Sequence, residues 1–172
     1  MRLSTLGVSL TAAMVLGASA GCSSDSPKRE FTAPKDLCGI AVPASSLTRL
    51  LPASGKQIDA KETKSDSRAT CEVQVDGDVV LTVERERVDA GRSAWNIASY
   101  DHGIGHVKSG DDDAIAYVDR ASVSVVPCRQ RGNQDEAMST YIRTLKPGRQ
   151  DESAMRGLIS RYTATLKEQR PC

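Results

Sequence analysis

Apolar and polar residues alternate most clearly in the middle of the chain, where they predict a β-hairpin. Residues 70–75 and 79–85 each follow strand spacing, and the Asp-Gly-Asp turn at 76–78 separates them. A three-residue loop puts the apolar side chains of both strands on one face, whereas a two-residue loop would separate them. The pairs that this register predicts are Val75–Val79, Val73–Leu81 and Cys71–Val83.

Three later segments are rich in β-formers and predict further strands at 114–118, 121–126 and 138–145. Two polar stretches show no consistent period. Residues 53–67 hold several lysines, and residues 101–113 are rich in glycine and acidic side chains. We expect both stretches to be loops.

Three segments show helical spacing, one before the predicted strands, one between them and one after them. A short helix is predicted over residues 43–51, because a proline suits its first turn and another proline follows its last. Residues 93–99, which include the only tryptophan, predict a second short helix. A longer helix over residues 151–169 has acidic residues at its start. The apolar residues that recur along it at helical spacing are Met155, Leu158, Ile159, Tyr162 and Leu166.

These elements together predict an α+β fold. We expect an antiparallel meander of about five strands, covered by a short N-terminal helix and a longer C-terminal helix. The strands do not alternate with helices of similar length. The pattern therefore excludes the βαβ units of nucleotide-binding folds.

The N-terminal region has the features of a targeting segment. Residues 3–20 carry no charge, but serines and threonines dilute them, and a membrane-spanning helix needs about 20 strongly apolar residues. Residues 1–21 therefore predict a secretory signal peptide. Ordinary signal peptidase would cut after Ala20. The alternative is a cut before Cys22, in a sequence that resembles a lipobox but has Ser19 where that motif prefers leucine.

The number of cysteines favours the second cleavage site. The chain has 172 residues and five cysteines, and an ordinary cut would leave an unpaired thiol in an oxidising compartment. Lipidation of Cys22 uses one cysteine and leaves four. Residues 22–34 are mostly polar and predict a disordered tether behind the lipid anchor. Residues 35–172 are long enough for one domain with a modest core.

The other four cysteines are predicted to form two disulfides. Cys38, Cys71, Cys128 and Cys172 show none of the close spacings of a zinc site. Three connectivities are possible. We favour Cys38–Cys71 with Cys128–Cys172, because each bridge would then tie a terminal segment to an adjacent strand, with about 3–4 kcal/mol of stabilisation from each.

Charge and motifs exclude several function classes. Twenty-three Lys and Arg stand against 22 Asp and Glu, and this balance argues against a nucleic-acid partner. The chain has no P-loop, no dinucleotide fingerprint and no serine-nucleophile or His-Glu-x-x-His motif. We therefore expect a protein without catalytic residues and without a cofactor.

The one cluster of metal-type ligands contains both histidines of the chain. His102 and His106 are four residues apart, and Asp111 follows them. Imidazoles and a carboxylate could hold a transition metal. Two glycines between the histidines argue against a preformed helical face, and this favours a solvated loop.

A candidate binding surface lies in the same region. Trp95, Tyr100 and Tyr117 could line a cleft together with the loop over residues 101–113. Aromatic side chains of this kind serve in a core more often than at a binding site. We would look for a ligand first along residues 95–113.

The layout resembles the small secreted lipoproteins of unknown function found in actinobacteria. The motifs that carry the resemblance are Ala-Gly-Cys22, the Ser/Pro tether, Leu37-Cys38 before a Leu-rich helix, Cys71 at the start of the hairpin, Gly110-Asp-Asp-Asp-Ala114 before a strand, and the C-terminal helix that precedes Cys172. The resemblance implies an envelope-facing α+β domain, in some cases with a photosystem-extrinsic-like fold. It implies no catalytic residues.

These observations predict a lipid-anchored binding or interaction module on the extracytoplasmic face of the cell membrane. Its expected partners are the membrane, through the N-terminal lipid, and an envelope protein or a small ligand. The alternative is a metal-binding protein or metal carrier that uses His102, His106 and a nearby aspartate.

Overall fold

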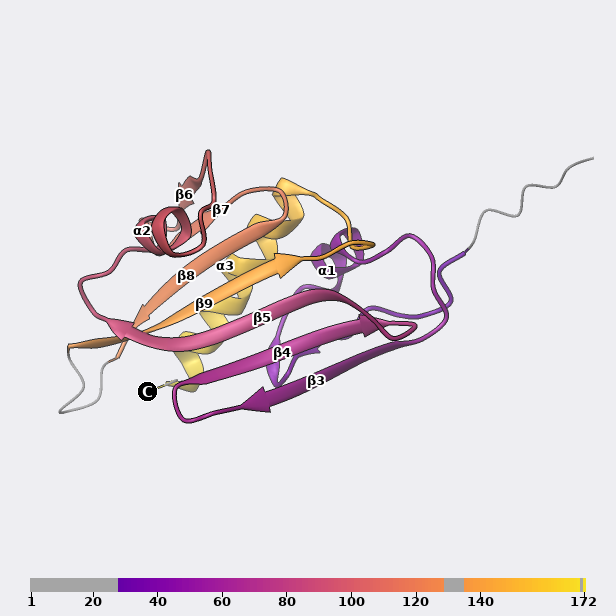
Figure 1. Ribbon diagram of the computed structural model, residues 1–172, viewed down its shortest axis with the longest axis horizontal. Helices are drawn as coiled ribbons and strands as arrows, with labels where there is room; N and C mark the ends of the chain where they lie inside the picture. The colour runs from indigo at the N-terminus through magenta and orange to yellow at the C-terminus, as the bar shows by residue number, and fades with distance from the viewer. Residues whose placement is uncertain (1–27, 129–134, 171) are drawn as a thin grey trace, which may run out of the picture.

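The computed structural model describes residues 28–128, 135–170 and 172 of the chain. It is an α+β fold with one large antiparallel sheet and helices on both of its faces (Figure 1). The predicted signal peptide, residues 1–21, and the predicted lipid site at Cys22 lie outside the described residues. Among the described residues, no helix has the length and the apolar character that crossing a membrane requires.

The sheet has seven described strands in the order β3-β4-β5-β9-β8-β7-β6, and every neighbouring pair is antiparallel. A separate two-stranded ribbon pairs β1 with β2. The bounds are β1 Asp36–Leu37, β2 Ile40–Ala41, β3 Ile58–Lys64, β4 Arg68–Val75, β5 Asp78–Asp89, β6 Lys108–Gly110, β7 Ile115–Tyr117, β8 Ala121–Pro127 and β9 Glu136–Thr144.

The sheet is larger than predicted, and its strands do not follow one another as a simple meander. Strand β9 returns to the centre and pairs with both β5 and β8. Strand β3 lies within residues 53–67, which were expected to be a loop, and β6 lies within the expected loop 101–113. Both are edge strands with mostly exposed or half-buried residues, so neither shows the alternation that marks a strand with one buried face.

The β4–β5 hairpin has the predicted face but a different turn. The pairs that the structure confirms are Val73–Leu81 and Cys71–Val83. The predicted pair of Val75 with Val79 is wrong, because Asp76 and Gly77 alone form the turn and Val75 faces Asp78. Both turn residues have positive φ, 53° and 93°, as two-residue hairpin turns require. A bulge just beyond the turn absorbs the extra residue of β5 and keeps the apolar faces together.

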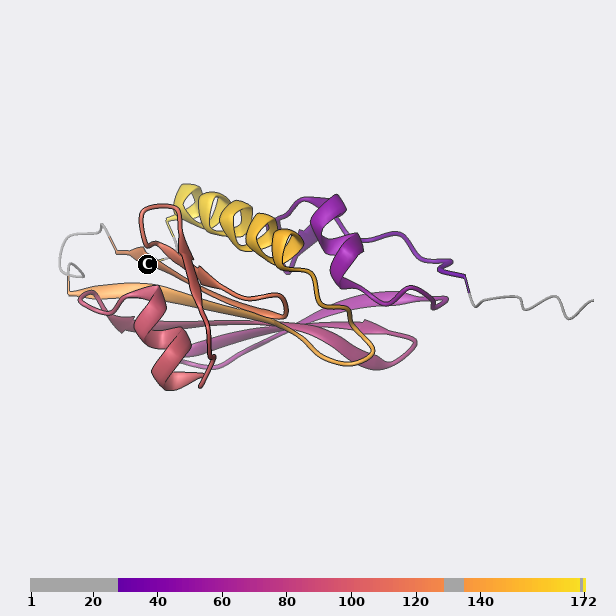
Figure 2. The same ribbon diagram turned by 90° about the horizontal axis from the view of Figure 1, so that it is seen from above.

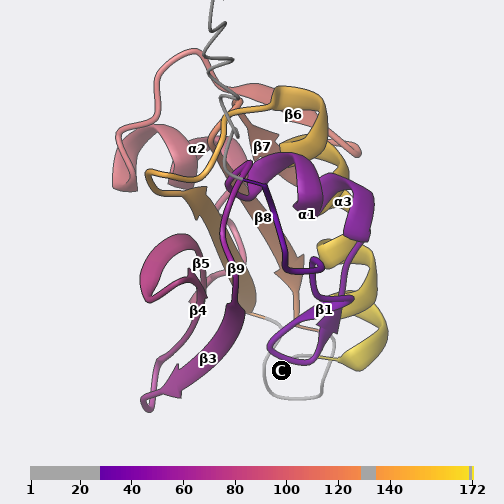
Figure 3. The ribbon, with the colours of Figure 1, turned by 90° about the vertical axis from the view of Figure 1, so that its right-hand side faces the viewer.

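The helices lie on both faces of the sheet (Figures 2 and 3). Helices α1 (Ala44–Leu50) and α3 (Glu152–Gln169) cover one face. On the opposite face lies the short helix α2 (Ala94–Asn96), which continues as the π-helical turn η1 (Ile97–Asp101) over β7 and β8. All five apolar residues predicted for the buried side of α3 are buried. The larger core lies between the sheet and α1/α3, and a smaller one lies under α2 and η1.

The domain begins earlier than residue 35. Arg29 forms a parallel bridge with Gly55, and the side chains of Phe31 and Ala33 are buried in the main core. Burial of the aromatic ring contributes to holding this short segment on the domain. The described part of the predicted tether, residues 28–34, therefore packs against the domain.

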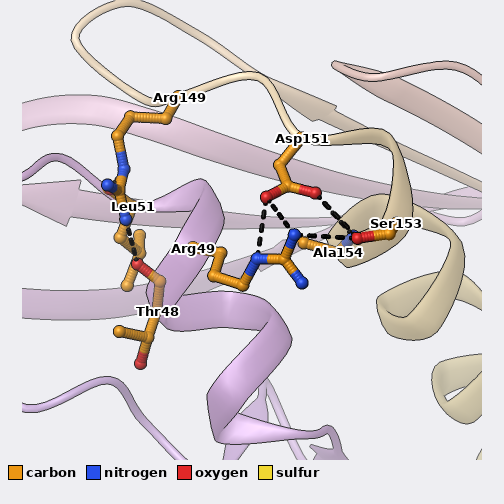
Figure 4. Close-up of polar contacts among 7 residues, drawn as sticks. All are labelled: Thr48, Arg49, Leu51, Arg149, Asp151, Ser153 and Ala154. Carbon is orange, nitrogen blue, oxygen red and sulfur yellow. Dashed lines mark hydrogen bonds and ion pairs between the residues drawn. The ribbon is translucent and has the colours of Figure 1, made fainter.

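The first turn of α3 is held by Asp151 (Figure 4). One carboxylate oxygen of Asp151 accepts a hydrogen bond from the backbone N–H of Ala154 at 3.0 Å, which is the usual N-cap geometry. The other oxygen accepts one from Nε of Arg49 on α1, at 2.7 Å. Arg49 also donates to the hydroxyl of Ser153 at 2.8 Å. Asp151 therefore links the start of α3 to α1.

The C-terminal end of α1 is held by two arginines. Arg149 donates to the carbonyl oxygens of Leu51 at 2.8 Å and Thr48 at 2.7 Å (Figure 4), and its own backbone N–H donates to that of Leu50 at 2.7 Å. Arg29 donates to the Leu51 carbonyl as well, at 3.0 Å. Carbonyls in the last turn of a helix lack partners within the helix. These side chains supply the partners and join α1 to both the N-terminal segment and the segment before α3.

We expect an Asp151→Asn variant to lose a pH-dependent part of its stability. The hydrogen bond from Ala154, and then those from Ser153 and Arg49, hold the pKa of the Asp151 carboxyl below its usual range. A depressed folded-state pKa stabilises the fold above the unfolded pKa of about 3.9, and that stabilisation disappears as the pH falls through the folded value.

Urea denaturation at several pH values tests this prediction. The wild type should be more stable than Asp151→Asn at pH 7, because asparagine can still cap the helix but cannot pair with Arg49. The gap should close below about pH 4. A gap that stays constant from neutral to acidic pH would contradict the assigned role of the charge.

Both predicted disulfides are present. Cys38 is bonded to Cys71, and Cys128 is bonded to Cys172. The first bridge ties the β1–β2 ribbon to the middle of β4, and the second ties the segment after α3 to the end of β8. The connectivity that we favoured among the three possibilities is therefore confirmed.

Candidate functional site

A groove with a volume of about 660 Å³ lies where β8 begins and β9 ends. We call it the basic groove. Small-ligand sites commonly measure about 300–1,000 Å³. The residues that line it come from four regions: the segment after η1 (102–106, Lys108), the β7–β8 connection (118–121), the end of β9 and its continuation (Tyr141, 143–145), and the start of α3 (Gln150, Glu152).

Sheet pairing brings the two arginines of the basic groove together. Arg143 on β9 pairs with Ala121 on β8, the residue immediately after Arg120. The backbone N–H of Thr144 donates to the carbonyl oxygen of Arg120 at 2.9 Å, which holds the two segments in register. Nε of Arg143 donates to the hydroxyl of Thr82 at 3.3 Å. The sheet thus fixes the backbones that carry both guanidinium groups.

The charge of the basic groove is positive on balance. Lys108, Arg120 and Arg143 line it against two carboxylates, Asp119 and Glu152. Lys108 and Glu152 form an ion pair at 2.8 Å and neutralise each other. Arg120 and Arg143 form no ion pair with any residue in the described part of the chain.

The wall of the basic groove contains a stacked pair of rings. His102 lies flat on Tyr141, with ring centroids 3.7 Å apart and an interplanar angle of 15°. Burial lowers the pKa of His102, although the nearby carboxylates of Glu84 and Asp101 oppose this effect. Burial likewise raises the pKa of Tyr141. Both rings are therefore neutral at pH 7, and the stack adds an apolar surface to a cationic groove.

The structure does not gather the predicted metal ligands. His102 stacks on Tyr141, and its Nε2 atom is buried and has no hydrogen-bond partner among the described residues. His106 is exposed and has a φ of 55°, and Asp111, with a φ of 53°, belongs to the tight turn between β6 and β7. Within the described ranges, no three His, Cys, Asp or Glu side chains cluster in a way that could hold a metal ion.

The three predicted aromatic binding residues do not form one surface. Trp95 and Tyr100 project from α2 and η1, with their rings edge to face at 5.9 Å, and they are 42% and 74% exposed. Tyr117 is only 8% exposed and belongs to the main core on the α3 side of the sheet. The guanidinium of Arg156 on α3 lies 5.8 Å from its ring centroid. The rings of Trp95 and Tyr100 thus form an aromatic pair without Tyr117.

The cationic residues of the basic groove were not predicted. Tyr141 and Arg143 are two residues apart on one strand, and this spacing places both on the same face of the sheet. Arg120 looks like an ordinary turn residue in the sequence. Only the pairing of β8 with β9 brings it to Arg143. Residues 102–106, which fall within the predicted binding region 95–113, do line the basic groove.

Comparison with known proteins assigns no family to this geometry. No protein-family model matches the chain. No curated protein and no solved structure matches it either. The groove, the disulfides and the sequence pattern are therefore the observations from which a function is proposed.

Proposed function

We propose that this chain is a lipid-anchored, non-catalytic binding module on the extracytoplasmic face of a bacterial cell membrane. The observation that carries the proposal is the pairing of Cys38 with Cys71 and of Cys128 with Cys172. Two disulfides in one small domain are typical of an oxidising compartment. They use four of the five cysteines and leave Cys22, which follows the predicted signal peptide, for the lipid.

The basic groove supports binding rather than catalysis. Its hydroxyl from Thr144 donates to the carbonyl oxygen of Arg120 at 3.4 Å, and no described base contacts it. The Nε2 atom of His102 is buried and has no hydrogen-bond partner, so no described hydroxyl or thiol donates a proton to it. General acid–base catalysis needs a base within hydrogen-bond reach of the reacting group. The described residues place a cationic, partly apolar groove here instead.

The metal-carrier alternative has less support. His102 is held by its stacking on Tyr141, and His106 is exposed on a separate stretch of the loop. A transition-metal site needs three or four ligands around one point. No described residues provide such a set.

Metabolic labelling tests the anchor. Cells that express the full-length chain and are grown with an alkyne fatty acid should yield a labelled protein in the membrane fraction. Cys22→Ser should abolish the labelling and release the protein from the membrane fraction or leave its signal peptide uncut. Ser23→Ala is the matched control and should behave like the wild type. Cys22→Ser protein that still takes up the fatty acid would refute the proposal.

A further inference from the structure

We propose that the basic groove binds a small organic anion, whose phosphate or carboxylate group contacts Arg120 and Arg143 while an apolar part lies against the groove wall. This inference deepens the proposed binding function by naming the class of ligand. It rests on the position of two cations, on their lack of ion-pair partners, and on the composition of the surrounding wall.

The first step is the position of the two arginines in the sheet. Arg120 precedes Ala121, which is the β8 partner of Arg143, so the two arginines lie on neighbouring segments at the same end of the sheet. The Nε atom of Arg143 is occupied by the Thr82 hydroxyl at 3.3 Å. This contact orients the guanidinium, whose central carbon lies 6.0 Å from the centroid of the Tyr141 ring. Two like charges at neighbouring positions repel each other, and an anion between them relieves that repulsion.

The second step is the contrast with the third cation of the basic groove. Lys108 pairs with the Glu152 carboxylate at 2.8 Å. Among the described residues, Arg120 and Arg143 form no such pair, even though the Asp119 carboxylate lines the same groove. Within the described part of the chain, no carboxylate therefore competes with a ligand for either guanidinium. A guanidinium binds a phosphate or carboxylate through two parallel hydrogen bonds, so arginine suits this ligand better than lysine does.

The third step concerns the rest of the ligand. The wall of the basic groove includes Ile104, Val118, Leu145 and the stacked ring of Tyr141. These side chains offer apolar contact but few hydrogen bonds. A ligand that combines an anionic group with a compact apolar group would fit both parts of the groove, in the way that small-molecule sites combine an apolar lining with a few polar groups.

Three probe compounds separate the contribution of the anionic group to binding from that of the apolar group. Phenyl phosphate carries both the anion and a ring, inorganic phosphate carries the anion alone, and benzyl alcohol carries a ring without charge. Their affinities for the oxidised full-length chain with Cys22→Ser are measured by calorimetry at low salt. We expect phenyl phosphate to bind more tightly than inorganic phosphate and benzyl alcohol not to bind. Added salt should weaken the binding of both anions.

Variants place the binding site. Arg120→Gln and Arg143→Gln should each weaken phenyl phosphate binding about tenfold, and the double variant should abolish it. Arg161→Gln is the matched control, because Arg161 is an exposed arginine on α3 that does not line the basic groove. Phenyl phosphate that binds the double variant as tightly as the control, or that binds neither protein at 10-fold molar excess over a millimolar chain, would overturn the inference.

The outcome is independent of the anchor. If phenyl phosphate does not bind while the wild-type chain takes up the fatty acid at Cys22, the ligand class is refuted and the anchored module stands. Phenyl phosphate binding to the basic groove, together with wild-type protein that takes up no fatty acid in the labelling experiment, would refute the anchor and leave the anion site standing. Each proposal therefore has its own readout.

Discussion

Removal of the Cys128–Cys172 disulfide will lower the free energy of unfolding by about 4 kcal/mol. The bridge joins residues that are 44 positions apart in the sequence. In the chain-entropy model, a closed loop of this length restricts the unfolded state enough to stabilise the native state by about 4 kcal/mol. The bridge also ties the end of the chain after α3 to β8, beside the main core that α3 covers.

Urea denaturation of a Cys128→Ser/Cys172→Ser double variant measures this loss. The variant keeps both side chains small, so the packing around them changes little. Cys38→Ser/Cys71→Ser is the internal comparison: its sequence separation is 33, and the same model predicts a loss of about 4 kcal/mol. A change below about 1 kcal/mol in either variant would mean that the unfolded chain is already restricted by residual structure.

Local pattern was sufficient for the elements that have one clearly buried side. The helix α3 shows its apolar residues at helical spacing, and the β4–β5 hairpin shows its apolar residues at strand spacing. The cysteines could be paired correctly because each bridge joins a terminal segment to a strand that was itself predicted. In these places the periodic signal and the tertiary contact agree.

Elements whose residues face water on both sides could not be predicted from such a local pattern. Strand β3 (Ile58–Lys64) is an edge strand of mostly exposed residues. Its pairing with β4 is a tertiary contact that leaves no periodic pattern in the sequence.

The π-helical turn η1 extends the predicted helix 93–99 by two residues, to Asp101. His102 follows directly after this turn and stacks on the ring of Tyr141.

The basic groove shows why a binding site is harder to predict than a core. Arg120, Arg143 and His102 come from three separate segments, and nothing in their spacing links them. The return of β9 between β5 and β8 creates the link. The alternative metal ligands lie apart for a related reason: His102 and His106 are close in sequence, but the positive φ of His106 (55°) is not that of a helix.

We expect Gly148→Ala to destabilise the protein by about 3 kcal/mol, as overpacking of a tight interior contact does. Gly148 lies between β9 and α3, where its backbone N–H donates to the carbonyl oxygen of Leu145 at 2.6 Å. A Cβ atom there would lie 2.6 Å from the carbonyl oxygen of Val80 and 2.7 Å from that of Leu145. Backbone atoms cannot turn away as a flexible side chain can, so the connection that precedes Arg149 would have to shift.

Gly91→Ala is the matched control for this effect, since a Cβ at Gly91 meets nothing within 4 Å. It should change stability by less than about 0.5 kcal/mol, or raise it slightly by restricting the unfolded chain. Urea denaturation compares the two variants directly. Equal stability would contradict the steric argument. A selective loss in Gly148→Ala would support the steric argument at this connection, which leads directly into Arg149 and its contacts with α1.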